Sequence, residues 1–244
     1  MTALGAVVFS VNYSLAPGYP FPSAVEDCAE SIVQICARAD EFRIDADCVI
    51  LSGFSSGGSL CLASWVVLQD PTRWGYHLSI PPLKVVGMAL FYPLLDLTIS
   101  RRKKRLSCTR PDLTLSKSLT DLFDASYLHP PIPRTERNDP RLSPGLMPEE
   151  WIDRLPPVHL CLCEYDMLLA EGVRFGERLK GRDKRVSVRI VAGEKHGWDK
   201  RPARRLKRSV LVEYDEAVKE MEDWVERANR PTLLSQAKGS VGQR

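Results

Sequence analysis

The chain has 244 residues, of which 44% are hydrophobic and 27% charged, and its formal net charge is +3. These values are typical of one soluble globular domain with a sizeable core. The net charge is too small to indicate a nucleic acid or a membrane surface as a partner. No apolar stretch is long enough to span a membrane, and residues 1–20 lack the charged start and apolar run of a signal peptide.

The seven cysteines are odd in number and form no C-x-x-C pair. This usage is typical of reduced thiols inside a cell. The chain ends in Val-Gly-Gln-Arg, unlike the peroxisomal Ser-Lys-Leu signal, so we expect a cytoplasmic protein. Six cysteines lie in apolar patterns and are expected to pack as small hydrophobic side chains: Cys28, Cys36, Cys48, Cys61, Cys161 and Cys163.

In chain order, the hydrophobic pattern predicts strands that alternate with helices. A strand is expected over 5–13 and, after a proline-rich loop, a helix over 24–39 with apolar residues at helical spacing. A short apolar strand follows at 48–51 and a helix at 60–68. Residues 85–91 are apolar on both faces, as in a central parallel strand.

The second half of the chain continues this alternation. A strand is expected over 158–163 and a helix with one apolar face over 168–179. Residues 186–191 alternate apolar and polar, which predicts a strand nearer the edge of the sheet. A long amphipathic helix is expected from Leu206 to Trp224. The alternation as a whole predicts an α/β fold, with a mainly parallel sheet covered by helices on both faces.

We expect one domain over residues 1–228 and a polar tail over 229–244. The stretch 94–148 interrupts the alternation with prolines and weak helical patterning, and is expected to be a lid-like insertion. Its basic cluster, 101–105, could serve an anionic substrate or act as a nuclear address. We interpret it as a solvated loop, and the basic stretch 200–208 likewise.

The segment Gly53-Phe54-Ser55-Ser56-Gly57 directly follows the strand at 48–51 and precedes a helix. It fits G-x-S-x-G, in which a sharp strand-to-helix turn exposes a serine hydroxyl. Glycine permits the close backbone approach that such a turn requires. The pattern predicts Ser55 as a nucleophile.

A serine nucleophile needs a base and an acid that orients the base. Among the four histidines, His196 stands in a glycine-containing loop after the last expected strand, where an α/β sheet builds its site. His77, His129 and His159 are expected to be structural or surface residues.

Asp166 follows the strand at 158–163 and is the preferred acid, because it gives the chain order Ser, Asp, His of α/β-hydrolases. Asp96, after the strand at 85–91, remains a competing acid. Glu164 is near enough to compete as well, but is expected to support the turn.

Four segments resemble, in order, the motifs of the hormone-sensitive-lipase-like esterases, the fold-3 group of α/β-hydrolases. Tyr13-Ser14-Leu15-Ala16-Pro17 with Phe21-Pro22-Ser23-Ala24 is similar to YRLAPE…FPAA, and Gly53-Phe54-Ser55-Ser56-Gly57-Gly58 to GDSAGG. Asp166-Met167-Leu168 is similar to DPL, and His196-Gly197-Trp198 to HGF. The resemblance covers essentially the whole chain, and its general look is that of esterases from fungal secondary-metabolite pathways.

This resemblance implies an α/β-hydrolase fold and ester hydrolysis without a cofactor or metal. It implies Ser55 as nucleophile, Asp166 as acid and His196 as base. The backbone N–H of Ser56 would be one donor of the oxyanion hole, the group of N–H donors that stabilises the developing negative oxygen.

The chain departs from the family at its N-terminal side, because it contains no His-Gly-Gly run to supply the other oxyanion donors. In the family a further strand lies between the strand expected at 5–13 and the one at 48–51, so we expect a truncated chain with a gap inside its sheet. A misplaced start codon or a degenerate gene product is the preferred explanation over a rearranged sheet. Asn12, Gly18 and Phe54 replace the family's Asp, Glu and Asp.

We therefore expect a serine hydrolase that cleaves carboxylic esters of a small molecule, in a fungal secondary-metabolite pathway such as toxin or polyketide synthesis. Two alternatives stay open. One is a catalytically impaired or non-catalytic small-molecule-binding protein, and the other is an acyl-CoA thioesterase. The expected partner is a small-molecule ester, and the oligomeric state is not indicated.

Overall fold

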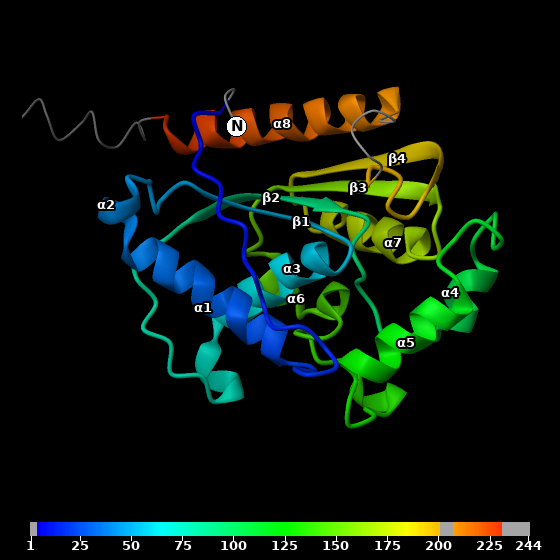
Figure 1. Ribbon diagram of the computed structural model, residues 1–244. Helices are drawn as coiled ribbons and strands as arrows, with labels where there is room; N and C mark the ends of the chain where they lie inside the picture. The colour runs from blue at the N-terminus through cyan, green and yellow to red at the C-terminus, as the bar shows by residue number, and fades with distance from the viewer. Residues whose placement is uncertain (1–3, 201–206, 231–244) are drawn as a thin grey trace, which may run out of the picture.

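A four-stranded parallel sheet forms the centre of the computed structural model, which describes residues 4–200 and 207–230 (Figure 1). Each strand pairs with the next one along the chain. The last strand lies at an edge, as its alternating pattern predicts. In sheet order the strands are β1 (Val49–Phe54), β2 (Val85–Phe91), β3 (Val158–Tyr165) and β4 (Val186–Lys195).

Helices cover both faces of this sheet (Figure 1). Helix α8 packs on one face, and α3 and α7 pack on the other, with α1 outside α3. The α-helices are α1 (Ser23–Ala37), α2 (Ala39–Phe42), α3 (Ser56–Gln69), α4 (Arg101–Leu106), α5 (Lys117–Tyr127), α6 (Glu149–Ile152), α7 (Leu169–Lys180) and α8 (Arg208–Ala228). Short 3₁₀ helices are η1 (Pro71–Trp74), η2 (Arg134–Glu136) and η3 (Pro144–Leu146).

The strand predicted over 5–13 is wrong, because this segment pairs with no strand among the described residues. Val7 and Val8 are 54% and 66% exposed, whereas Val11 and Tyr13 pack against α1 and α3. β-Branched residues favour a strand only where a neighbouring strand offers hydrogen bonds and packing. The sheet accordingly has no internal gap, and β1 forms its edge in the described part of the chain.

Other boundaries differ by a few residues. The helix predicted over 24–39 ends at Ala37, and a separate short helix, α2, follows it. The helix predicted from Leu60 already begins at Ser56, because the glycines before Leu60 are tolerated in its first turn. The closing helix begins at Arg208, and Leu206 lies outside the described residues, as does the expected tail from residue 231 onward.

The basic cluster at 101–105 is helix α4, so its interpretation as a solvated loop is wrong. The side chain of Ser100 caps the helix by accepting a hydrogen bond from Lys103 N–H. Lys104 is only 3% exposed, and Arg101 forms an ion pair with Asp124 of α5 (Nη2–Oδ1 2.7 Å). Most of the second basic stretch, 201–206, lies outside the described residues.

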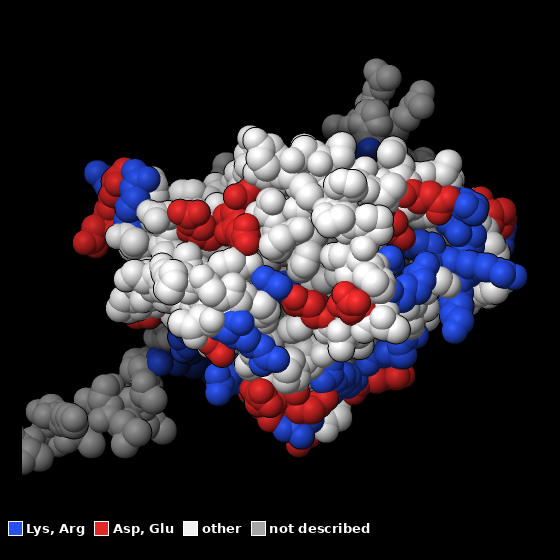
Figure 2. Space-filling model, turned by 90° about the horizontal axis from the view of Figure 1, so that it is seen from below, with Lys and Arg blue, Asp and Glu red and all other residues white. Residues whose placement is uncertain are grey.

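On the face shown in Figure 2, charged residues of both signs lie in small groups between uncharged areas, and basic residues gather on the right. No helix within residues 4–200 and 207–230 is long and apolar enough to cross a membrane. All seven cysteines are unpaired, and the six predicted to pack as hydrophobic side chains are buried or partly buried.

Candidate active site

The strand-to-helix turn predicted at Ser55 is present: β1 ends at Phe54 and α3 begins at Ser56. Ser55 has φ +53°, a strained conformation for a residue with a side chain. A Cβ at Gly53 would lie 2.3 Å from the carbonyl group of Gly57, so only glycine fits there. The chain thus holds the serine on a sharp bend at the carboxyl end of β1.

The structure brings together the three predicted site residues, Ser55, His196 and Asp166. The Nε2 atom of His196 lies 2.8 Å from Ser55 Oγ, and its Nδ1 atom lies 2.6 Å from Asp166 Oδ2. Asp166 follows β3 and His196 follows β4. Because the strands are parallel, both side chains lie at the carboxyl ends of the strands, as Ser55 does. The other oxygen of Asp166 accepts a hydrogen bond from Leu168 N–H (3.1 Å), which fixes the carboxylate.

The two competing carboxylates lie elsewhere. Asp96 accepts hydrogen bonds from the backbone N–H and hydroxyl of Thr98 (2.8 and 2.6 Å) and makes no contact with His196. Glu164 accepts a hydrogen bond from Gly193 N–H of β4 (2.5 Å), so its side chain bonds to the neighbouring strand.

Sequence reasoning missed the support of the imidazole ring. Tyr92 lies edge-on against His196 with ring centroids 4.7 Å apart, and its hydroxyl donates to Asp199 (2.6 Å). The hydroxyl of Tyr214 donates to the other oxygen of Asp199 (2.7 Å). Burial by itself raises the pKa of Asp199, but the two tyrosine hydrogen bonds and nearby Lys200 hold this pKa below its usual value. An ionised carboxylate therefore anchors the histidine loop three residues after His196.

The only hint of this support in the sequence is position: Tyr92 directly follows β2, and Asp199 stands in the same loop as His196. A second missed contact comes from the segment 94–148, where the hydroxyl of Thr114 accepts a hydrogen bond from Met167 N–H (2.9 Å). Neither contact has a sequence motif, because each joins segments far apart in the chain.

The remaining histidines do not reach the site. His77 and His129 are exposed in connecting segments. His159 is fully buried within β3, where its ring nitrogens have no hydrogen-bond partner among the described residues. Burial lowers the pKa of His159, so its ring is neutral.

The backbone N–H of Ser56 belongs to the first turn of α3 and has no acceptor among the described residues. Such free N–H groups at a helix start favour a negatively charged oxygen. Within residues 4–200 and 207–230, no three His, Cys, Asp or Glu side chains gather as a set of metal ligands.

Comparisons with known proteins agree with this fold. A family model described as alpha/beta hydrolase fold matches residues 1–200. Carboxylic ester hydrolase LipN of Mycobacterium tuberculosis is 31% identical over 78% of this chain and 48% of its own length. Ethyl acetate hydrolase of Pseudomonas putida is 27% identical over 80% of this chain and 56% of its own length. The chain thus spans about half the length of these curated relatives.

Solved structures show the same fold. A fungal esterase structure from Rhizomucor miehei matches with a TM-score of 0.76 and 24% identity, over 89% of this chain and 64% of the other. The hydrolase LAE6 from the metagenome of Lake Arreo matches with a TM-score of 0.72 and 26% identity, over 86% and 61%. The chain belongs to the alpha/beta hydrolase family that its motifs predict, that of the hormone-sensitive-lipase-like esterases.

Proposed function

We propose that this protein is a serine carboxylesterase that acts on a short acyl ester of a small molecule. One observation carries the proposal: the imidazole of His196 is hydrogen-bonded on one side to Ser55 and on the other to Asp166. The names of the relatives, which include a carboxylic ester hydrolase and an ethyl acetate hydrolase, support the same reaction class.

In the proposed reaction, Ser55 Oγ attacks the ester carbonyl while His196 Nε2 takes the hydroxyl proton. The tetrahedral intermediate collapses, His196 returns that proton to the leaving alcohol, and the acyl group remains on Ser55. A water molecule then gives a proton to His196 and attacks the acyl-enzyme, which forms a second tetrahedral intermediate. This intermediate collapses, Ser55 Oγ leaves and takes that proton from His196, and the acid is released. Asp166 holds the imidazole ring and stabilises its charged form in both steps.

Ser56 N–H is the proposed oxyanion donor among the described residues. The family takes its other donors from a His-Gly-Gly loop that this chain does not contain. Loss of one such donor lowers turnover by about 10²–10³-fold in enzymes of this type. We therefore expect slow hydrolysis wherever Ser56 N–H acts as the single oxyanion donor.

The experiment is hydrolysis of p-nitrophenyl esters of increasing acyl length, with a burst of p-nitrophenol that measures acyl-enzyme formation. The wild-type chain is expected to show a burst followed by slow turnover, with short acyl groups preferred. Ser55→Ala is expected to abolish both phases. Ser56→Ala is the matched control, because it removes a neighbouring hydroxyl and keeps the proposed backbone donor.

A second function stays open: a non-catalytic protein that binds a small molecule at the same site. Stoichiometric binding of a non-hydrolysable ester analogue, with no burst on any ester, would support it over the esterase. The thioesterase alternative loses support, because Lys104 of the basic cluster is buried and Arg101 is paired.

The proposal extends to the domain organisation, the pathway and the location of the protein in the cell. We propose a single domain over 1–228, with 94–148 as a lid-like insertion and 229–244 as a polar tail. The proposed role in fungal secondary metabolism rests on the general resemblance of the sequence to esterases of such pathways. The unpaired cysteines favour a reducing, cytoplasmic setting.

A further inference from the structure

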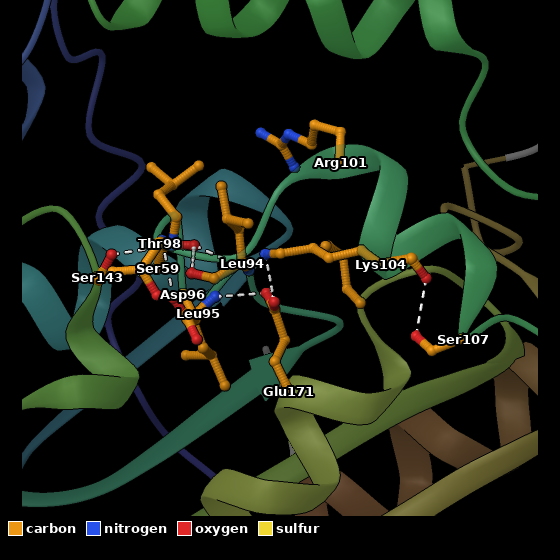
Figure 3. A network of polar contacts seen from close by, with 12 residues as sticks. Ser59, Leu94, Leu95, Asp96, Thr98, Arg101, Lys104, Ser107, Ser143 and Glu171 are labelled. Atoms are coloured by element: carbon orange, nitrogen blue, oxygen red, sulfur yellow. Dashed lines mark hydrogen bonds and ion pairs between the residues drawn. The ribbon is translucent and has the colours of Figure 1, made fainter. Parts of the chain in front are cut away.

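A buried ion pair joins the segment 94–148 to the helix that follows Asp166 (Figure 3). Lys104 of α4 contacts Glu171 in the first turn of α7, and their side chains are 3% and 2% exposed. The second oxygen of Glu171 accepts a hydrogen bond from Leu95 N–H (2.8 Å). One carboxylate therefore connects α4, α7 and the segment that follows β2.

The same network continues to Ser59 of α3, the helix that follows Ser55 (Figure 3). Leu94 N–H donates to the hydroxyl of Ser59 (3.0 Å), and that hydroxyl donates to the carbonyl oxygen of Leu94 (2.6 Å). Ser59 lies one turn into α3, and its N–H donates to the carbonyl oxygen of Ser55 (3.2 Å). Hydrogen bonds between side chains and backbone thus link Glu171, through residues 94–95, to the helix that follows Ser55.

On the other side, the network reaches the acid. Glu171 stands five residues after Asp166, in the helix that the Asp166 turn opens. Leu169 N–H donates to the carbonyl oxygen of Asp166 (3.1 Å), and Leu168 N–H donates to its side chain (3.1 Å). A shift of the first turn of α7 would therefore move the Asp166 carboxylate relative to Ser55.

Packing alone does not secure this contact, because cavities flank the ion pair. A cavity of about 160 Å³ lies between α4 and α7, lined by Lys103, Lys104, Ser107, Ala170, Glu171 and Arg174. A second cavity of about 310 Å³ borders Glu171 beside Leu95 and Asp96. Burial lowers the pKa of Lys104 and raises the pKa of Glu171, so each group needs the other to remain charged.

We propose that Lys104 and Glu171 are positioning residues that hold the Asp166 turn in register with Ser55. Neither side chain contacts the three site residues, so both act through the backbone of α7 and of residues 94–95. The inference rests on the proposed esterase function. The proposal gives the segment 94–148 a role in positioning Asp166, in addition to its proposed role as a lid-like insertion.

The test compares Lys104→Met and Glu171→Gln with wild type. Glutamine keeps an acceptor for Leu95 N–H and removes the charge. For each variant, kcat is measured per active site, with the burst amplitude or fluorophosphonate labelling as the count of sites. We expect kcat per site to fall about 10- to 100-fold while KM stays within twofold, because a small misplacement of a catalytic group has effects of this size. Arg102→Met, at an exposed position of the same helix that lines neither cavity, is the control and keeps wild-type kcat.

A merely structural role gives a different result. It would lower the melting temperature and the number of labelled sites, and it would leave kcat per labelled site unchanged. The double variant Lys104→Met/Glu171→Gln separates the two, because it leaves neither buried charge without its partner, which is the main cost of removing one member of such a pair. If kcat per site recovers together with stability in this double variant, the positioning role is wrong.

The failure of this inference is distinguishable from failure of the proposed function. A wild-type chain without burst or labelling contradicts the esterase proposal itself. A wild-type chain that is active, with single variants within twofold of its kcat per site, contradicts only the roles of Lys104 and Glu171.

Discussion

The ammonium group of Lys200 lies 3.2 Å from the centre of the Phe54 ring, directly joining the histidine loop to the residue before Ser55. The same ammonium group is 3.0 Å from Asp199. Phe54 occupies the position at which the family's motif carries Asp. An aromatic face here attracts the lysine cation and so links the two segments of the site.

This cation–π contact predicts an energetic coupling between Phe54 and Lys200. In a double-mutant cycle with Phe54→Leu and Lys200→Gln, we expect a coupling of about 0.5–1 kcal/mol in the free energy of unfolding, because Lys200 is half exposed. Urea denaturation of the four proteins measures it. Strictly additive single effects would show that the contact contributes nothing.

Asp166→Asn is expected to lower kcat by about 10⁴-fold, because an asparagine in place of the carboxylate favours the wrong tautomer of the His196 ring. Asp96→Asn is the control, since Asp96 bonds only to Thr98 and lies away from the imidazole. Steady-state kinetics on a p-nitrophenyl ester compare the two. Equal losses in both variants would contradict the assignment of the acid.

Gly53→Ala is expected to destabilise the fold by about 1–3 kcal/mol, because its Cβ would overlap the backbone at Gly57 and force the turn to shift. Gly57→Ala is the matched control: its Cβ meets open space within α3, and alanine stabilises a helix by up to about 1 kcal/mol relative to glycine. Thermal unfolding ranks the variants. A Gly53→Ala protein as stable as wild type would rule out the close approach at the turn.

His159 predicts a pH dependence of stability. Burial holds its folded pKa below the ordinary value of 6.5, so below about pH 6.5 the unfolded chain binds a proton that the folded chain does not. Stability is therefore expected to fall as the pH drops through this range. His159→Leu should remove this part of the slope between pH 7 and 5, whereas exposed His77→Gln should leave it intact. Parallel slopes for wild type and His159→Leu would contradict the burial of a neutral ring.

The sequence was sufficient for the parts of the fold that depend on local pattern. The run at 85–91 is apolar on both faces and is β2 to the residue, and the glycines around Ser55 mark the turn between β1 and α3. The closeness of the three candidate site residues could be predicted because each directly follows a strand, and the carboxyl ends of parallel strands lie at the same end of the sheet.

The features that the sequence did not predict have a common physical cause: each is decided by contacts with residues remote in the chain. Residues 5–13 have strand composition, yet a strand forms only beside a partner. By its sequence Lys104 is one of several lysines and arginines expected to be solvated. In the structure it forms an ion pair with Glu171, which belongs to a helix far along the chain. The contact of Tyr92 with His196 is hidden for the same reason.

The central claim is that the hydroxyl of Ser55 is activated by His196 and Asp166. Labelling with a fluorophosphonate probe, followed by mass spectrometry of the modified peptide, tests it most directly. The account predicts one label per chain, carried by Ser55, absent in Ser55→Ala and strongly slowed in His196→Ala. A label that persists in Ser55→Ala, or a folded wild-type chain that takes up no label, would contradict it.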